Sequence, residues 1–482
     1  PTRTGSSGVV VQDGSHADVI DSLINTAGDL SHGIHVKSNG TADVVGSEIV
    51  TSGNLDAHGV FVESDGRTTI VTSSITTTGA DRSHGLAATS GGAIEASKVS
   101  IRTQGQWSRG VDARDNGSIK ISDSDVTTDG VAAHGLLASN GGSIISDGTH
   151  INTLGSGAQG VLAHGGTIIF NNGSVRNEGV QTHGLQASDS GNLTAENTSV
   201  HMLGTGSSAI YVESNGSFNG SNLTLLAEGE SGKGVFMNSP AAAPLSLSHS
   251  TIAVTGANAA GVQIMSGEGR FDDVAVETTG VASTAVQVNG AQSRAEFHDS
   301  QIVSEGVNSS AASLLDGATL YISNSALNSQ AAAALLMENG TFTAANGTTI
   351  EGNGTLAQFG SDSANTLNFD QNVVALGDIR FTEDALDADG NGTLDRTSAL
   401  SLDHGSYWRG ATDAVGSVTL SNGSRWDVTS DSQIGELSLA NATLAFDHAD
   451  GHYKTVTVDG DFQADNGLLL MNTALGDDNS GT

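Results

Sequence analysis

The sequence predicts an all-β chain folded as a right-handed, three-sided parallel β-helix with coils of about 25 residues. Three observations predict this solenoid: a small residue that recurs at a nearly fixed interval, alternating apolar residues after it, and a turn signal that closes the segment. The small residue stands at positions 8, 33, 59, 85, 110, 135, 160, 184, 209, 234, 261, 285, 312 and 334. An interval of roughly 25 residues accommodates three short strands and three corners, which is one turn of such a solenoid.

The residues that follow the small residue alternate between apolar and other side chains, as in Ile34/Val36 and Val60/Val62. Alternation with period two predicts a strand that places these side chains on one face. Asn-Gly or Asp-Gly then predicts a sharp turn with positive φ, at 39, 65, 116, 140, 215, 289, 316 and 339. A second alternating run follows, for example over 167–170, and a stretch rich in Ser, Thr, Gly and Asp leads to the next copy.

The strength of the period divides the chain into three segments. Regular repeats are predicted over 1–340. The period loosens over 341–406, where we expect irregular coils with an acidic, Gly-rich loop. Residues 407–482 are predicted to cap the solenoid, because unpaired backbone at the end of a parallel stack invites edge-to-edge aggregation.

Composition and charge exclude several classes of partner and chemistry. The chain has 18 Lys+Arg against 53 Asp+Glu, a formal net charge of −35, so neither nucleic acid nor an anionic membrane is expected as a partner. It has no Cys, which excludes disulfides, thiolate metal sites and a Cys nucleophile. No apolar run approaches 18 residues, so we expect no direct membrane insertion, and the first residues are not a signal peptide.

Three motifs near the C-terminus carry a family resemblance. They are Trp408-Arg409-Gly410-Ala411, the segment 424–439 that begins Ser-Arg-Trp-Asp-Val-Thr, and the segment 453–478 that begins Tyr-Lys-Thr-Val-Thr-Val. Together with the repeated His-Gly turn, they resemble the pertactin-like passenger domains of autotransporters, which are type V secreted proteins.

The resemblance implies a cell-surface location for the protein. Such a passenger is exported through the outer membrane of a Gram-negative bacterium by its own C-terminal β-barrel translocator, which is absent from this sequence, and it stays anchored there or is released. The conserved C-terminal segment is expected to act as an autochaperone that seeds folding, with Trp408, Trp426 and Tyr453 in the folding cap. The alternative is that the two tryptophans are ordinary core residues of a β cap.

Five histidines share one register of the repeat: His32, His58, His84, His134 and His183, with Arg109 and Gln159 at the equivalent positions of the turns before and after that of His134. In a stack of turns, consecutive rings would lie about 5 Å apart. Such a ladder could bind a divalent metal, or titrate near pH 6.5 and loosen the stack in acid. The alternative is a structural corner residue whose ring stacks on its neighbours, and Arg109 argues against a continuous metal site.

One acidic loop fits a calcium-binding pattern. Asp387, Asp389, Asn391 and Asp395 stand at positions 1, 3, 5 and 9 of the pattern D-x-D-x-N-G-x-x-D. Position 12 is Ser398 instead of a bidentate Glu, so calcium would bind weakly. The alternative is an acidic connecting loop, and no cofactor is required by the rest of the sequence.

Outward positions of the first strand are the better functional lead. Five of them carry large apolar side chains that could bind a ligand: Phe61, Leu137, Leu162, Tyr211 and Phe236. Leu137/Leu162 and Tyr211/Phe236 are predicted to form pairs on adjacent turns, and exposed apolar patches tend to mark interfaces. The alternative is that side loops fold over them.

The leading prediction for function is a non-enzymatic surface adhesin. It would bind a host extracellular matrix or cell-surface protein or glycan, or another copy of itself, through the lateral face of the β-helix. One alternative is an immune-evasion protein that captures a host complement or serum regulator. Another is a polysaccharide-degrading enzyme, which needs clustered carboxylates with a basic partner in a groove, whereas the acidic residues here are scattered along the sequence.

Overall fold

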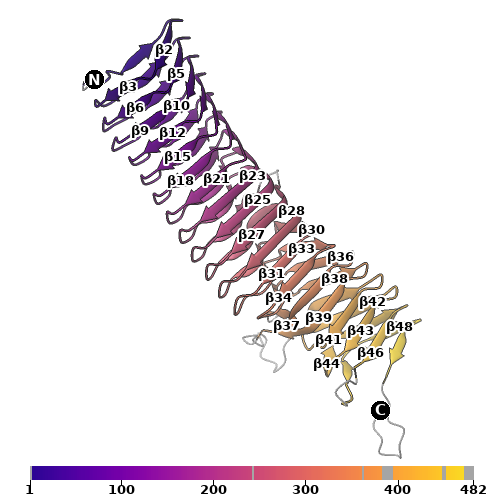
Figure 1. Ribbon diagram of the computed structural model, residues 1–482. Helices are drawn as coiled ribbons and strands as arrows, with labels where there is room; N and C mark the ends of the chain where they lie inside the picture. The colour runs from indigo at the N-terminus through magenta and orange to yellow at the C-terminus, as the bar shows by residue number, and fades with distance from the viewer. Residues whose placement is uncertain (1–2, 241–243, 361–362, 383–394, 448–451, 472–482) are drawn as a thin grey trace, which may run out of the picture. The chain divides into compact units, whose positions relative to one another are not determined.

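The computed structural model describes residues 3–240, 244–360, 363–382, 395–447 and 452–471. Every regular element in these ranges is a β-strand, and strands from successive turns pair in parallel, as Figure 1 shows. The predicted all-β parallel solenoid is therefore confirmed. The chain divides into two compact units, 1–257 and 258–482, and each is described by itself.

The first unit has three columns of strands, one for each side of a turn. The first column is β1 (Val9–Val11), β4 (Ile34–Val36), β7 (Val60–Val62), β10 (Leu86–Ala88), β13 (Val111–Arg114), β16 (Leu136–Ser139), β19 (Val161–His164), β22 (His183–Ser188), β24 (Ser208–Glu213) and β26 (Lys233–Asn238). The second is β2 (His16–Ile20), β5 (Thr41–Val45), β8 (Arg67–Val71), β11 (Ala93–Ser97), β14 (Ser118–Ser122), β17 (Ser143–Asp147) and β20 (Thr167–Asn171). The third is β3 (Leu23–Thr26), β6 (Glu48–Thr51), β9 (Ser74–Thr77), β12 (Ser100–Thr103), β15 (Asp125–Thr128), β18 (His150–Thr153) and β21 (Ser174–Asn177). Later turns join the second and third sides in one strand: β23 (Asn192–Met202), β25 (Ser217–Ala227) and β27 (Leu245–Val254).

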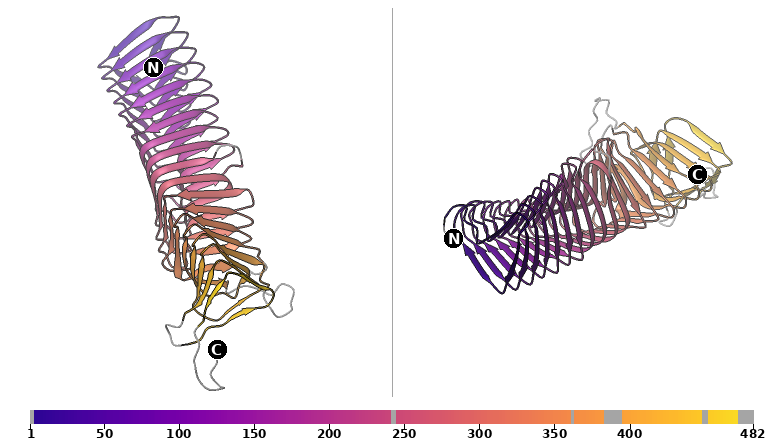
Figure 2. Two further views of the ribbon diagram at one scale, coloured as in Figure 1. Left: turned by 90° about the vertical axis from the view of Figure 1, so that its right-hand side faces the viewer. Right: turned by 90° about the horizontal axis from the view of Figure 1, so that it is seen from above.

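The second unit continues the same parallel pattern within itself, with longer and less regular strands. It begins with β28 (Ala260–Thr278), β29 (Thr284–Asn289), β30 (Ser293–His298), β31 (Gln301–Ser304), β32 (Ala312–Leu315), β33 (Thr319–Ser323), β34 (Ala326–Ser329), β35 (Leu335–Glu338), β36 (Thr341–Ala345), β37 (Thr349–Phe359), β38 (Thr366–Asp370) and β39 (Val374–Phe381). It ends with β40 (Ser398–Leu402), β41 (Tyr407–Gly410), β42 (Val415–Ser421), β43 (Arg425–Val428), β44 (Ser432–Ile434), β45 (Glu436–Ala440), β46 (Thr443–Phe446), β47 (Val456–Val458), β48 (Phe462–Asp465) and β49 (Leu468–Leu470). Figure 2 shows the stacked turns from two further sides. The division at 340 and 406 stays a prediction.

The core of each unit is a set of inward-facing columns. Val60 pairs with Ile34 on one side and Leu86 on the other, and all three side chains are fully buried. Each buried side chain therefore contacts its equivalent in the next turn, at the strand spacing of about 4.8 Å. This repetition explains why the apolar alternation of the sequence is so regular.

The small residue before the first strand has a steric cause. A Cβ added at Gly59 would lie 2.2 Å from Cγ2 of Ile75 and 2.7 Å from the carbonyl oxygen of Gly85 in the next turn. A side chain here would displace either the third strand or the next turn. Gly59 and its equivalents therefore recur because the backbone passes close to two neighbours.

The turn after the first strand has the predicted positive φ. It lies on the Asn or Asp in most turns, with 58° at Asn39 and 61° at Asp65, and on the glycine alone at Gly290, where φ is 97°. A Cβ at Gly66 would lie 2.9 Å from the carbonyl oxygen of Val36. Asn and Asp thus make the bend, and the glycine permits close approach of the previous turn.

An amide ladder that the sequence did not reveal runs along another corner. Asn222 donates a hydrogen bond of 2.6 Å to the side-chain oxygen of Asn197, which donates one of 3.1 Å to Asn172. Asn172 in turn donates one of 2.6 Å to Asp147. The three asparagines also have positive φ. Each therefore adopts the backbone conformation that the turn requires and also hydrogen-bonds to the equivalent side chain of the neighbouring turn. The described ranges contain no helix that is long and apolar enough to cross a membrane.

Candidate binding surface

The outward face of the first column is more buried than predicted. Leu137 and Leu162 are only 4% and 9% exposed, so this pair is not available to a ligand and the expectation of an open apolar pair is wrong there. The reason is the register: Leu137 lies between Asp112 and Leu162 on adjacent turns, and each outward side chain covers the next. Phe61, Tyr211 and Phe236 remain partly exposed.

A stack of side chains on adjacent turns forms what we call the aromatic strip: His183, Tyr211, Phe236 and Lys233. The ring of Tyr211 stacks on His183 at 4.0 Å between centroids and on Phe236 at 5.1 Å. Nζ of Lys233 lies 5.9 Å from the Phe236 ring centroid, within range of a cation–π contact. The strip therefore presents a rigid aromatic surface beside a cation, on a face where the outward side chains Leu137 and Leu162 are buried.

Hydrogen bonds fix the position of the strip. The Tyr211 hydroxyl donates to Oε2 of Glu213 at 3.1 Å, and the side-chain amide of Gln186 donates to Oε1 of the same carboxylate at 3.0 Å. Burial, together with the Glu213 charge, raises the pKa of Tyr211 to about 12. Tyr211 therefore stays a neutral donor held in one orientation.

The structure stacks the first three histidines of the ladder. The ring centroids of His32 and His58 are 4.9 Å apart, those of His58 and His84 are 4.7 Å apart, and the rings of each pair are nearly parallel. Phe61 packs against His32 and His58 at 4.8 and 5.2 Å. Phe61 thus belongs to the wall of this stack as well as to the outward face.

Each stacked ring also accepts a backbone hydrogen bond from the next turn. Nδ1 of His58 accepts the amide of His84 at 3.1 Å, and Nδ1 of His84 accepts the amide of Arg109 at 3.0 Å. His32 and His134 do the same for the amides of His58 and Gln159. An accepting Nδ1 requires the neutral ring with its proton on Nε2.

Burial keeps these rings neutral. Desolvation lowers the pKa of His32 and of His134 to about 3 and that of His183 to about 4, and it holds the pKa of His58 and of His84 well below the usual range. The expectation that the folded ladder titrates near pH 6.5 is therefore wrong, because a buried imidazolium would lose both its hydration and its amide partner. Metal binding by the ladder stays a prediction, although the Nδ1 atoms that accept amides are already engaged.

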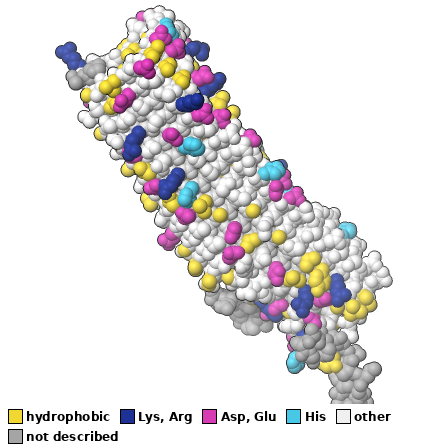
Figure 3. Space-filling view, in the orientation of Figure 1, with side chains coloured by type: hydrophobic (Ala, Val, Ile, Leu, Met, Phe, Trp, Pro, Cys, Tyr) yellow, Lys and Arg dark blue, Asp and Glu magenta, His cyan; other side chains and the backbone are white. Residues whose placement is uncertain are grey.

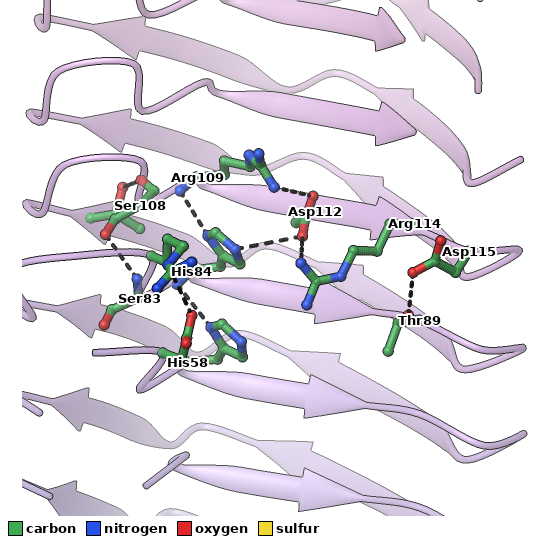
Figure 4. Close-up of polar contacts among 12 residues, drawn as sticks. His58, Ser83, His84, Thr89, Ser108, Arg109, Asp112, Arg114 and Asp115 are labelled. Carbon is green, nitrogen blue, oxygen red and sulfur yellow. Dashed lines mark hydrogen bonds and ion pairs between the residues drawn. The ribbon is translucent and has the colours of Figure 1, made fainter. Parts of the chain in front are cut away.

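A buried ionic cluster interrupts the ladder, as Figure 4 shows. Asp112 is fully buried, and its Oδ1 lies 3.1 Å from Nη1 of Arg109. Its Oδ2 lies 3.6 Å from Nη1 of Arg114 and 3.6 Å from Nε2 of His84. Arg109 therefore replaces a histidine of the ladder because it neutralises a carboxylate that the fold buries.

Most residues of the predicted calcium loop lie outside the described ranges. Asp387, Asp389 and Asn391 lie outside the described residues, and Asp395 is exposed just before β40. The calcium site stays a prediction.

The predicted folding cap contains one tight aromatic pair. Trp408 and Trp426 are fully buried and stack at 4.7 Å in register on adjacent turns. Their indole N–H groups donate to the carbonyl oxygens of Gly377 and Gly410, each at 2.9 Å. Tyr453 is 47% exposed, and its role in folding stays a prediction, as does that of the tryptophans.

The second unit has a polar cavity that sequence reasoning missed. Its volume is about 460 Å³, and Glu351, Asp378, Asp447, Arg409 and Lys454 line it together with a floor of glycines. Two of its carboxylates already serve the fold: Asp378 accepts the amide of Ala411 at 2.8 Å, and Asp447 accepts Arg409 at 2.7 Å. These acidic residues do not follow the repeat period, so no sequence signal brings them together.

Charge is dispersed on the surface drawn in Figure 3. Lys and Arg side chains lie singly among Asp and Glu rather than in a basic patch. This face offers no concentrated positive surface to a polyanion.

Comparison with known proteins agrees with the fold and the C-terminal motifs. Residues 432–482 match the family described as Autochaperone Domain Type 1. The BrkA autotransporter of Bordetella pertussis is 30% identical over 232 residues, which are 46% of this chain and 20% of BrkA. The match thus spans about a fifth of the length of that curated relative. A chain of the solved Vag8–C1 inhibitor complex shares the fold with a TM-score of 0.66, at 18% identity, over 90% of this chain and 99% of that chain.

The parallel solenoid and its C-terminal autochaperone domain define the class of protein, a passenger domain built on a β-helix. The family match, the relative and the shared fold together support a pertactin-like autotransporter passenger with a C-terminal autochaperone domain.

Proposed function

We propose that this passenger is a non-enzymatic surface adhesin that binds a host matrix or cell-surface protein through the aromatic strip. As an autotransporter passenger it would act at the bacterial cell surface or after release from it. The observation that carries the proposal is the partly exposed stack of His183, Tyr211 and Phe236 with Lys233 beside it. Interface centres are enriched in aromatic residues, and rigid aromatic anchors supply most of the binding energy.

A second candidate is capture of a host serum regulator. It is favoured by the shared fold with a chain of the complex between Vag8 and C1 inhibitor. The same strip would serve this function, because the chemistry of an aromatic anchor does not depend on whether the partner is in serum or in the matrix. The two candidates differ only in the partner that they predict.

The proposal of a non-enzymatic protein is supported by the contacts around the polar cavity. Asp378 and Asp447 are held by an amide and a guanidinium, so they are engaged in the fold rather than free to transfer protons. Incubation with matrix glycans and peptides should therefore release no product. Product release that is lost in a Glu351→Gln variant would contradict the proposal.

The test is a double substitution, Tyr211→Ser with Phe236→Ser, measured against immobilised collagen, fibronectin and C1 inhibitor as separate probes. The matched control is Ile145→Ser with Ile169→Ser, a pair of exposed apolar residues on adjacent turns of the second column. The strip variant should lose binding to one probe by at least about tenfold while the control keeps it. Equal loss in both variants, or none in the strip variant, would contradict the role of the strip, and the probe that responds decides between matrix and serum partners.

A further inference from the structure

Two carboxylates and an imidazole converge at one corner of the second unit. β38 and β40 pair in parallel with Phe369 opposite Leu402, so Asp370 and Asp403 leave their strands at the same corner on adjacent turns. Nδ1 of His404 lies 2.8 Å from Oδ1 of Asp370 and 3.2 Å from Oδ2 of Asp403. One ring nitrogen thus faces a carboxylate oxygen from each of two turns.

The Asp403 carboxylate is oriented by three hydrogen-bond donors. Its Oδ1 accepts the hydroxyl of Ser421 at 2.8 Å, the side-chain amide of Asn422 at 2.7 Å and the backbone amide of His404 at 2.8 Å. With Oδ1 fully engaged, Oδ2 is left to face the imidazole. These three hydrogen bonds hold Oδ1 in place on the side of the carboxylate away from the ring.

The backbone of His404 is held in its turn as well. Its φ is 45°, and its carbonyl oxygen accepts the amide of Asn372 at 3.0 Å. The amide of Gly405 donates to Asn422 at 3.1 Å. The ring is therefore presented by a turn that is fixed from both neighbouring turns, which is what a preorganised ligand requires.

We propose that Asp370, Asp403 and His404 bind a divalent transition-metal ion of the zinc class. The separations of 2.8 and 3.2 Å between Nδ1 and the two carboxylate oxygens are close to the roughly 3.3 Å between ligand atoms at about 2.0 Å from a tetrahedral ion. Three protein ligands leave one position open to water or to a group from a partner. Nδ1 coordinates the ion once its proton is released, and the ion relieves the repulsion between two stacked carboxylates.

The imidazole decides which ions fit. Calcium and magnesium take oxygen ligands, whereas a nitrogen with two carboxylates favours Zn²⁺, Ni²⁺ or Cu²⁺. The side chain of His404 is 58% exposed and those of Asp370 and Asp403 are 42% and 35% exposed, so an ion can reach all three. The site is distinct from the histidine ladder, in which His32, His58, His84 and His134 are buried.

A second cluster of the same composition provides an internal comparison. Nε2 of His16 lies 3.2 Å from Asp18 but 3.8 Å from Asp43, so its two carboxylates are less well gathered around the ring. We therefore assign the tighter binding to the His404 corner. His16 supplies a matched control in the same chain.

The test is calorimetric titration of the untagged full chain with Zn²⁺ at pH 7.5, and with Ca²⁺ as the competing ion. His404→Asn keeps a residue that tolerates positive φ, so the turn should survive, which an unchanged melting temperature would verify. This variant should lose the tightest Zn²⁺ site, with affinity reduced about 100-fold, and Ser421→Ala should weaken it about tenfold through the orientation of Asp403. His16→Asn should leave that site within twofold.

Three results would overturn the proposal. One is an unchanged tightest Zn²⁺ site in the His404→Asn variant. Another is loss of that site in the His16→Asn variant instead. The third is Ca²⁺ binding at the His404 corner as tight as Zn²⁺ binding, which would mean that the imidazole contributes nothing.

Discussion

The backbone amide of His84 donates a hydrogen bond of 3.1 Å to Nδ1 of His58, one turn earlier in the stack. The two rings lie 4.7 Å apart and 6° from parallel. A single residue type thus satisfies a buried amide and fills the corner between two turns. The free energy of unfolding should therefore depend on pH, because Nδ1 of the ring can accept this hydrogen bond only while the ring is neutral.

The first prediction concerns acid stability. His58 faces His32, His35, His84 and Arg114, and its pKa is lowered well below 6.5 in the folded chain. The unfolded chain therefore binds more protons than the folded chain below pH 6.5. The contribution of the neutral His58 ring to the free energy of unfolding is thus full above that pH and is lost as the pH falls. Each such histidine should cost about 1.4 kcal/mol of unfolding free energy per pH unit below 6.5.

The measurement is the denaturation midpoint between pH 7 and pH 4 for the wild type and His58→Gln, since Gln159 already occupies the equivalent position in another turn. The variant should show a shallower fall of stability with acid. His150→Gln, at an exposed ring, is the control and should leave the slope unchanged. A variant at position 58 with the wild-type slope would show that the ladder does not govern acid stability.

The second prediction concerns the buried carboxylate of Asp112. Asp112→Ala leaves the guanidinium groups of Arg109 and Arg114 near one another without their shared counter-ion. Because 21% and 35% of the two arginine side chains are exposed, water can solvate the charges left behind, and the loss should be about 2–3 kcal/mol of unfolding free energy. Denaturant unfolding measures it, with Arg102→Ala at an exposed ion pair as the control, where a loss below about 1 kcal/mol is expected. Equal losses in the two variants would contradict the burial argument.

The third prediction separates packing from folding in the tryptophan pair. Trp426→Ala removes a fully buried ring and its hydrogen bond to Gly410, and it should cost about 3–5 kcal/mol. Phe462→Ala, at a half-exposed ring, should cost far less. If the pair also seeds folding, refolding of Trp426→Ala should slow in proportion to the lost stability, whereas a pure core role speeds only unfolding. Unfolding and refolding rates after denaturant jumps give this answer.

The fourth prediction isolates the amide ladder. Asn197→Gly keeps access to positive φ but removes the hydrogen bonds to Asn172 and Asn222, whereas Asn197→Ala removes both the bonds and the turn preference. We expect Asn197→Gly to lose about 1–2 kcal/mol and Asn197→Ala to lose roughly 1 kcal/mol more. Thermal melting compares them, and a glycine variant as stable as the wild type would show that the ladder contributes nothing.

The repeat period was enough to predict the fold. The recurring Gly59 equivalents and the alternation around Val60 report directly on inward packing, and these are local signals that repeat in every turn. Exposure of the outward side chains could not be predicted, because Leu137 is covered by neighbours from other turns. The pKa of His58 depends on the same packing between turns and was therefore mispredicted.

The sites of the second unit escaped prediction for a related reason. Asp370 and Asp403 occupy equivalent positions on adjacent turns, yet they are separated by more residues than the usual period. The period breaks between β39, which ends at Phe381, and β40, which begins at Ser398. Residues that meet across an irregular turn carry no fixed spacing, so only the register of the folded strands reveals them.

Every proposal here depends on in-register stacking, and engineered cysteines test it most directly because the chain has none of its own. Thr69 and Glu95 are partners on adjacent turns, and Lys120 is the partner of Glu95 one turn further on. Under mild oxidation Thr69→Cys with Glu95→Cys should form a disulfide, since about 4.8 Å between strands lies within disulfide range, whereas Thr69→Cys with Lys120→Cys should not. Equal cross-linking of both pairs, or cross-linking of the distant pair alone, would contradict the stacked solenoid.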